Sequence, residues 1–326
     1  MSWGGIDVTV LPPPPRPSGG PAPGIEPGAE RLPEGPILFH VDASAGGGSM
    51  VPVAEISGDT LIPLRATADA RVYGENFIAE HMRQGSEFVV FREGVRAGTF
   101  IVSGAALDSS LCGPVPRASG SLELGEAGTG VGEFLALERV QAPQVPRRAA
   151  QPLEATRAMR VLAPIYADKL LRNRQAGLPG NWERAMAQLA VIRLSDTRNP
   201  GFTSTFLVGD TLGPGLDDAG HSLFFVAMPS QLGYDTVYVS FHDYARTGKA
   251  APQVVDFLDW DRDEWPELLV RVFGARSTWF EAVGRDTGGR WRRIFSDRCE
   301  VEPTPAAPPS RPDTVTAAPP DTSGTR

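Results

Sequence analysis

The chain has 326 residues, of which 41% are hydrophobic, 36 are Gly and 31 are Pro, and its formal net charge is −8. This length favours two folded domains, and the many Gly and Pro residues argue against a long helical bundle. The negative charge opposes binding to nucleic acid or to an anionic membrane surface, and no apolar window is long enough to span a bilayer.

Residues 1–36 are rich in Pro and Gly and poor in apolar side chains. Such a stretch buries too little surface to offset its loss of conformational entropy, so we predict a disordered segment. Residues 301–326 have the same composition and carry the same prediction. The first six residues contain neither the basic nor the apolar region of a secretory signal, so the start of an exported chain is expected upstream.

Residues 37–140 are predicted to form a β-rich domain with one helix, because short stretches of alternating apolar and polar residues dominate this block. Glu93 and Gly94 stand between two strand-like runs and predict a hairpin turn. The predicted helix covers residues 74–84. It places Phe77, Ile78, His81 and Met82 on one face.

Residues 141–152 are predicted to form a linker, and residues 153–195 a helical hairpin. The first helix is predicted from Glu154 to Arg174, with a kink or a new start at Pro164. A second helix is expected after Gly180 and Asn181. Its apolar face would contain Trp182, Ala185, Met186, Leu189 and Ile192.

From residue 196 to residue 300, seven short apolar runs alternate with turn residues. Their near-regular spacing predicts an antiparallel meander or sandwich. The whole pattern predicts an α+β fold that is mainly β. Two β-rich blocks of short antiparallel strands would be joined by the helical hairpin and flanked by disordered termini.

The most specific motif is D-W-D-R-D-E-W-P-E-L at residues 259–268, between two predicted strands. Hard divalent cations such as Ca²⁺ bind about six to eight oxygen atoms, and acidic residues at alternate positions place carboxylates on one side of a turn. The motif is not an EF-hand, because Val270 stands where a bidentate Glu is needed. The candidate metal ligands are the carboxylates of Asp259, Asp261, Asp263 and Glu267 and the backbone carbonyl of Trp265.

This turn resembles the calcium loop of FG-GAP/VCBS repeats, the units of integrin-alpha-type β-propellers, over about residues 254–273. The resemblance implies Ca²⁺ as the ion and the five ligands just named. The family usually has Gly at the sixth position, where this chain has Glu264, and a left-handed backbone there costs roughly 1 kcal/mol. A propeller needs several such blades, so we expect a single blade-like hairpin within another β architecture.

A solvated acidic turn is the alternative interpretation. Six carboxylates lie within residues 256–267, and Arg262 is the one local positive charge. Such crowding is repulsive unless a cation or raised pKa values relieve it. Under either interpretation the role is structural, because a saturated carboxylate cage leaves no open position for a substrate.

Catalytic signatures are weak. The chain has no nucleophile elbow and no catalytic cysteine signature. The Gly-rich run at residues 125–132 lacks the Lys-Ser/Thr pair of a phosphate-binding loop and is expected to connect two strands. No close metal-ligand pair is formed by the histidines, which are His40, His81, His221 and His242.

We therefore predict a non-enzymatic bacterial protein with a binding or structural role, for which protein and glycan partners both remain open. The alternative is a hydrolase with its site near His242 and Asp243, in a cleft between the two blocks. Asp210 or Asp217 would assist as acid or base. A deep pocket that converges on His242 would favour the hydrolase.

Cys112 and Cys299 are the two cysteines, which excludes a disulfide scaffold and an all-cysteine zinc site. One disulfide between them and two free thiols both remain open. A calcium turn and a cysteine pair suit an oxidising, calcium-rich compartment. We therefore expect a secreted, periplasmic or cell-surface protein, with the cytoplasm as the alternative.

Overall fold

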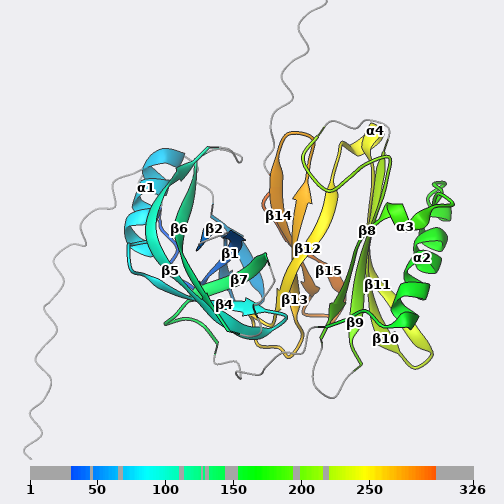
Figure 1. Cartoon of the computed structure of the whole chain (residues 1–326), viewed down its shortest axis with the longest axis horizontal. Coiled ribbons are helices and arrows are strands. Elements are labelled where there is room, and N and C mark those ends of the chain that lie inside the picture. Colours follow the sequence, from blue (N-terminus) through cyan, green and yellow to red (C-terminus); the bar gives the residue numbers. More distant parts are fainter. Residues whose placement is uncertain are drawn as a thin grey trace, which may run out of the picture.

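The computed structural model describes residues 31–298 except 45–46, 65–68, 110–113, 126–127, 129–131, 144–152, 194–198 and 216–219. Within this part, three antiparallel sheets lie side by side, with helices on the two outer sides (Figure 1). The predictions for the tail, for the cysteine pair, for most of residues 1–36 and for most of the linker concern residues outside the described part.

Six N-terminal strands close into a barrel in the order β1-β7-β4-β5-β6-β2, because β1 pairs with β2 as well as with β7. Ile37, Phe39 and Val41 of β1 face the barrel core, whereas Leu38 faces outward. The predicted turn at Glu93 and Gly94 is confirmed. The strands are β1 (Ile37–Ser44), β2 (Gly47–Ser57), β3 (Thr60–Pro63), β4 (Glu87–Arg92), β5 (Val95–Asp108), β6 (Val115–Leu124) and β7 (Glu133–Glu138).

The helix α1 (Ala70–His81) packs on the barrel and supplies Phe77 to its core, where Phe77 is fully buried. Asp69 caps the helix by accepting hydrogen bonds from two backbone N–H groups of the first turn. Because of this cap, α1 begins four residues before the predicted start at Gly74.

Part of the segment predicted to be disordered belongs to the barrel. The N–H of Ile56 donates to the carbonyl of Pro36 at 2.7 Å, which extends the backbone pairing of β2. Leu32 packs against the barrel core. The N–H groups of Glu34 and Gly35 also donate to Glu55 of β2, so an apolar contact and several hydrogen bonds hold residues 31–36 in place.

The C-terminal half forms two four-stranded antiparallel sheets that pack face to face, in the orders β11-β10-β9-β8 and β12-β13-β14-β15. The seven predicted runs became β9 to β15, and the antiparallel sheets expected of a meander or sandwich are confirmed. The strands are β8 (Met186–Ile192), β9 (Gly201–Val208), β10 (His221–Ser230), β11 (Gly233–Asp243), β12 (Ala251–Leu258), β13 (Glu267–Phe273), β14 (Thr278–Arg285) and β15 (Trp291–Ser296).

The predicted helical hairpin is wrong in its second half. Its first helix is α2 (Arg157–Arg172), which contains Pro164. The second helix is a single turn, α3 (Trp182–Ala185), after which the chain enters β8. Since β8 pairs with β9 along its length, sheet pairing overrides the helical spacing of the apolar residues. A further single turn, α4 (Tyr244–Thr247), follows β11.

The sheet β12–β15 is the middle layer of the molecule (Figure 1). One face packs against the outside of the barrel, through Leu258, Leu269 and Ala282. The other face packs against the sheet β8–β11, whose far side is covered by α2. Two separate β-rich blocks were predicted. The structure instead stacks four layers, which are the barrel, the middle sheet, the outer sheet and the helix α2.

Phe91→Ala should destabilise the protein, because Phe91 of β4 is fully buried between the barrel and the middle sheet. We expect a loss of about 3–5 kcal/mol in the free energy of unfolding, measured by urea denaturation. Val140→Ala is the control: Val140 is 84% exposed, and its loss should stay within about 0.5 kcal/mol. A similar loss in both variants would contradict the packing described.

Candidate functional site

The loop between β12 and β13 brings together three of the five predicted metal ligands. Asp259, Asp261 and Glu267 each present one carboxylate oxygen, and these oxygens lie within 4.8 Å of one another. The pairing of Leu258 with Glu267 closes the hairpin and places the first and ninth loop positions side by side. Oxygen atoms gathered in this way suit a hard cation.

The loop backbone wraps around the carboxylate of Asp259. The N–H of Asp263 donates to Asp259 Oδ1 at 3.1 Å, and the N–H of Glu264 donates to Oδ2 at 3.2 Å. Glu264 has a φ of 71°, in the left-handed region expected for the sixth position, and Arg262 has a φ of 68°. Each such non-glycine residue costs about 1–2 kcal/mol, so the surrounding contacts must hold the loop in this shape.

Glu267 carries the largest electrostatic penalty in the loop, because it is only 3% exposed. Burial, together with the charge of Asp261, raises the pKa of Glu267 to about 9. The N–H of Trp260 donates to Glu267 Oε2 at 3.1 Å and opposes this rise. Burial also raises the pKa values of Asp259 and Asp261. A cation or bound protons must therefore relieve the negative charge.

Gly284 of β14 leaves the space into which Glu267 fits. A Cβ atom at this position would lie 3.0 Å from Glu267 Cγ and 3.0 Å from Ile294 Cδ1. Both contacts are closer than side chains normally approach, so a larger residue would displace Glu267. The buried carboxylate thus depends on a glycine in the neighbouring strand of the sheet.

The other two predicted ligands lie in the loop but outside the group of three. Asp263 Oδ1 accepts a hydrogen bond from the N–H of Trp265 at 2.7 Å. The Trp265 ring packs against Arg285, whose guanidinium carbon lies 4.2 Å from the ring centroid. The side chain of Trp265 therefore anchors the loop to β14.

Trp260 joins the loop to the barrel. Its side chain is 6% exposed and belongs to the apolar cluster between the barrel and the middle sheet, together with Leu38 and Phe91. The backbone N–H of Trp260 donates to Glu267, so this one residue contacts both the acidic site and the barrel. A change in the charge of the loop therefore acts directly on this interface.

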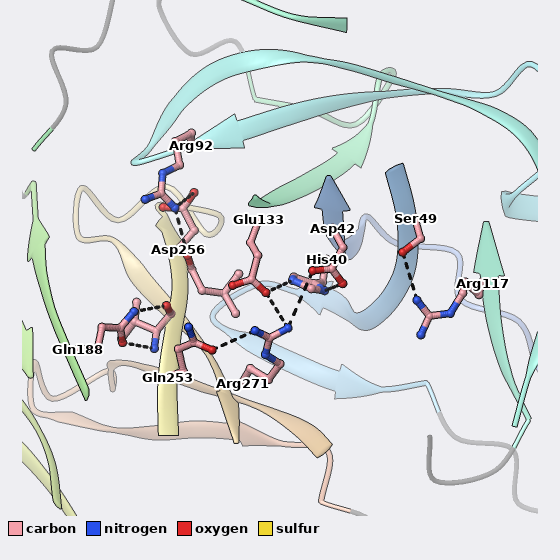
Figure 2. A network of polar contacts seen from close by, with 12 residues as sticks. His40, Asp42, Ser49, Arg92, Arg117, Glu133, Gln188, Gln253, Asp256 and Arg271 are labelled. Atoms are coloured by element: carbon pink, nitrogen blue, oxygen red, sulfur yellow. Dashed lines mark hydrogen bonds and ion pairs between the residues drawn. The ribbon is translucent and has the colours of Figure 1, made fainter. Parts of the chain in front are cut away.

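A polar network bridges the barrel and the middle sheet nearby (Figure 2). His40 of β1 is 2% exposed, and its Nε2 lies 3.2 Å from Glu133 Oε1. Arg271 Nη1 of β13 lies 2.6 Å from the same oxygen, and Arg271 Nη2 donates to Gln253 Oε1 at 2.9 Å. Burial acts to raise the pKa of Glu133, but the hydrogen bond with His40 and the charge of Arg271 outweigh it and lower the pKa.

This network also has the composition of a metal site, because His40, Asp42 and Glu133 offer ligand atoms within 4.8 Å of one another. Arg271 already supplies a positive charge to both carboxylates, at 2.6 Å from Glu133 and 3.9 Å from Asp42. The cluster therefore acts as an ion-paired joint between two layers.

Asp256 of β12 holds the β4–β5 turn against the middle sheet (Figure 2). Its carboxylate is 2% exposed and accepts hydrogen bonds from the N–H of Glu93, at 2.9 and 3.1 Å, and from that of Phe257, at 2.8 Å. A bulge in β12 between Val254 and Asp256 aims it at the turn. Burial raises the pKa of Asp256 to about 7, although Arg92 lies 3.8 Å away and opposes the rise.

His242 and Asp243, the predicted acid–base pair, point to opposite faces of β11. His242 lies on the face toward the middle sheet, where its Nε2 is 3.1 Å from Ser240 Oγ. Asp243 lies on the other face, where its charge acts on His221. The predicted catalytic pair is therefore not brought together, and the partner of His242 is a serine.

Asp210 has a structural role. Its Oδ1 lies 2.6 Å from Lys249 Nζ, and its Oδ2 accepts a hydrogen bond from the Tyr244 hydroxyl at 2.9 Å. The side chains of Asp210 and Lys249 are both almost fully buried. A carboxylate neutralised in this way is a poor acid or base for His242. Asp217, the other assisting residue that was predicted, lies outside the described residues.

Two further positions of the candidate sites, Ser240 and Asp256, could have been found from the sequence pattern. The run Y-V-S-F-H at residues 238–242 alternates polar and apolar side chains, so Tyr238, Ser240 and His242 must share one face of a strand. Asp256 interrupts the apolar run V-V-D-F-L, which marks a buried carboxylate. Its partner, the turn after Arg92, could not be found this way because the two are more than a hundred residues apart.

No family model, curated protein or solved structure matches this chain. In the part of the chain that the structure describes, no helix is long and apolar enough to cross a membrane. The function must therefore be argued from the geometry of these sites.

Asp256→Asn should flatten the dependence of stability on pH. The folded pKa of Asp256, about 7, lies above the roughly 3.9 of an unfolded Asp, so its contribution is full below about pH 4 and is lost as pH rises through 7. Between about pH 5 and pH 8, ionisation of Asp256 should lower the free energy of unfolding of the wild type by on the order of 2–3 kcal/mol.

Urea denaturation at a series of pH values measures this effect. Asp256→Asn keeps an oxygen that can accept from the N–H of Glu93, so the variant should fold and lose less stability over the same range. Asp235→Asn, at an exposed position of β11, should follow the wild type. Equal pH slopes for the wild type and Asp256→Asn would contradict the assignment.

Proposed function

We propose that this is an extracytoplasmic bacterial protein with a binding or structural role, in which Ca²⁺ bound at the β12–β13 loop fastens the barrel to the sandwich. The supporting observation is the convergence of Asp259, Asp261 and Glu267 on one point, with Glu267 almost fully buried among negative charges. Without a cation, that carboxylate must keep a proton at neutral pH. With a divalent cation, two of the three negative charges are balanced and all three carboxylates gain a positive neighbour.

Calcium is the ion that fits this donor set best. The candidate ligands are all oxygen atoms, and the loop offers no imidazole or thiolate that would favour zinc. Ca²⁺ accepts variable numbers of oxygen ligands, so the Asp263 carboxylate and the Trp265 carbonyl can complete its shell. Mg²⁺ requires near-ideal octahedral geometry and retains water, which suits a loop of this kind less well. The likeness to FG-GAP/VCBS calcium loops supports the same choice.

The proposed role of the ion is mechanical. Trp260 lies inside the loop and also packs between the barrel and the middle sheet, and Asp256, three residues before Asp259, holds the β4–β5 turn. An ion that orders residues 259–267 therefore orders both contacts with the barrel. The site would set how firmly the two bodies are joined and would leave their surfaces available to a partner.

The hydrolase alternative, as first framed around His242 and Asp243, has less support. The two side chains lie on opposite faces of β11, and Asp210 forms a buried ion pair with Lys249. A catalytic role at His242 would need a different set of partners.

Millimolar CaCl₂ should raise the melting temperature of the wild type above its value in EDTA. A ligand at about 100 times its Kd stabilises by about 2.7 kcal/mol, and each kcal/mol raises the melting temperature by roughly 2–4 °C in a protein of this size. MgCl₂ at the same concentration should give a smaller rise. Differential scanning fluorimetry measures both.

Glu267→Gln should abolish the calcium response and melt near the wild-type temperature in EDTA, because the buried carboxyl is already protonated without the ion and Gln keeps an acceptor for the N–H of Trp260. Asp59→Asn, an exposed turn residue outside the loop, should keep the full response. A wild-type melting temperature that calcium leaves unchanged would refute the proposed ion site.

A further inference from the structure

The edge of the sandwich between β11 and β14–β15 has a polar interior. Tyr238, Ser240 and His242 face the middle sheet, whereas Val239 and Phe241, between them, pack on the side of α2. Interior positions of a sandwich are normally apolar, and polar side chains there cost free energy unless they are paired. This row of side chains therefore points to a chemical role.

Ser240 and His242 form a hydrogen-bonded pair in which Ser240 Oγ lies 3.1 Å from His242 Nε2. Both residues are partly exposed. Burial lowers the pKa of His242, which leaves the imidazole neutral at pH 7 and able to accept a proton. A neutral imidazole within hydrogen-bond distance of a hydroxyl is the arrangement that activates a serine nucleophile.

Glu281 of β14 provides the carboxylate opposite this pair and is 8% exposed. Its Oε1 accepts hydrogen bonds from Trp279 Nε1 at 3.1 Å, Arg293 Nη1 at 3.1 Å and Ser296 Oγ at 3.4 Å. Its Oε2 accepts none from the described residues. Glu281 is also the carboxylate that most strongly raises the pKa of His242, so it stabilises the imidazolium that would form when His242 takes a proton.

Two arginines give the edge a positive rim. Arg293 is half exposed beside Glu281, and Arg298 stacks over the Trp279 ring with its guanidinium carbon 5.1 Å from the centroid. Both lower the pKa of His242, so both lie close enough to act on a charge beside it. Arg298 has no ion-pair partner among the described residues. The rim can therefore attract an anionic group and stabilise an oxyanion near Ser240.

We infer that Ser240 is a nucleophile activated by His242, in a site that hydrolyses small carboxylic esters whose acyl group carries a negative charge. Ser240 Oγ attacks the carbonyl carbon while its proton passes to His242 Nε2. The leaving alcohol departs with that proton. Water then attacks the acyl-serine and passes a proton to His242. The bond from the acyl carbon to Ser240 Oγ breaks, His242 returns the proton to Ser240 Oγ, and the carboxylic acid leaves.

This site revives the hydrolase alternative with different residues, and it does not rest on the calcium loop. Ser240 takes the place of an unidentified nucleophile, and Glu281, which positions His242, takes the place of Asp243. The calcium experiment and the ester experiment can therefore fail independently.

The first test is covalent labelling of the full chain with a biotinylated fluorophosphonate, followed by mass spectrometry of the labelled peptides. The peptide that contains Ser240 should carry the label, and prior denaturation should abolish the labelling. Ser240→Ala should carry no label, and Asp243→Asn should be labelled like the wild type. Absence of label from the folded wild type, or label confined to other peptides, would overturn the inference.

The second test is hydrolysis of mono(4-nitrophenyl) succinate and of 4-nitrophenyl acetate. Ser240→Ala and His242→Gln should lower kcat/KM by about 100-fold or more, while melting curves show that both variants remain folded. Arg298→Gln should lower kcat/KM for the succinate several-fold more than for the acetate. Equal activity of Ser240→Ala and wild type, or equal effects of Arg298→Gln on both esters, would refute the assigned roles.

The positioning role of Glu281 has its own readout, the pH profile of kcat/KM. The wild-type profile should rise through the pKa of His242, to which Glu281, Arg293 and Arg298 all contribute. Glu281→Gln should shift this limb to lower pH and lower the plateau, because the imidazolium loses its negative neighbour. A plateau that falls with no shift of the limb would mark Glu281 as structural only.

Discussion

The two-sided burial of the sheet β12–β15 is the constraint on which the molecule depends. Leu269 and Ala282 pack toward the barrel, while Leu268 and Val270 pack toward the outer sheet, so consecutive residues of one strand are both buried. On a sheet with no solvated face, every charged side chain loses its hydration and is destabilising unless it is paired. Each carboxylate on it must therefore find donors, a proton or a cation. The acidic loop, Asp256 and Glu281 all lie on this sheet or at its ends.

Its three buried carboxylates meet this constraint in different ways. Asp256 accepts N–H groups from the barrel turn and carries a pKa of about 7, so it is a joint that weakens as its proton is lost. Glu281 accepts hydrogen bonds from an indole, a guanidinium and a hydroxyl on one of its oxygens. Glu267 has one backbone donor and acidic neighbours, and this imbalance makes it the residue that a cation would satisfy.

Local patterns predicted much of this architecture. The seven C-terminal runs, the hairpin at Glu93 and Gly94 and the left-handed position at Glu264 all follow from features within a few residues. Local patterns failed at β8. The spacing of apolar residues from Met186 to Ile192 suits a helix, but the segment forms a strand because it pairs with β9. The pairing of β1 with β2 that closes the barrel could not be predicted from the sequence either, because the inner and outer faces of the barrel strands are both apolar. In the candidate sites, the residues of the acidic loop could be predicted from the motif itself. The partner of His242 could be predicted only from the alternation of side chains along a strand.

The strand β14 connects the two candidate sites. Gly284 leaves room for Glu267 at one end of it, and Glu281, three residues earlier, faces His242. The pairing of Val270 with Glu281 and of Leu268 with Val283 ties both positions to β13, which begins at Glu267 itself. Glu267 and Glu281 therefore lie on two directly paired strands. Glycine at position 284 has an ordinary backbone conformation, so its role is to leave space, and the chain accepts a weaker strand position there to bury a carboxylate.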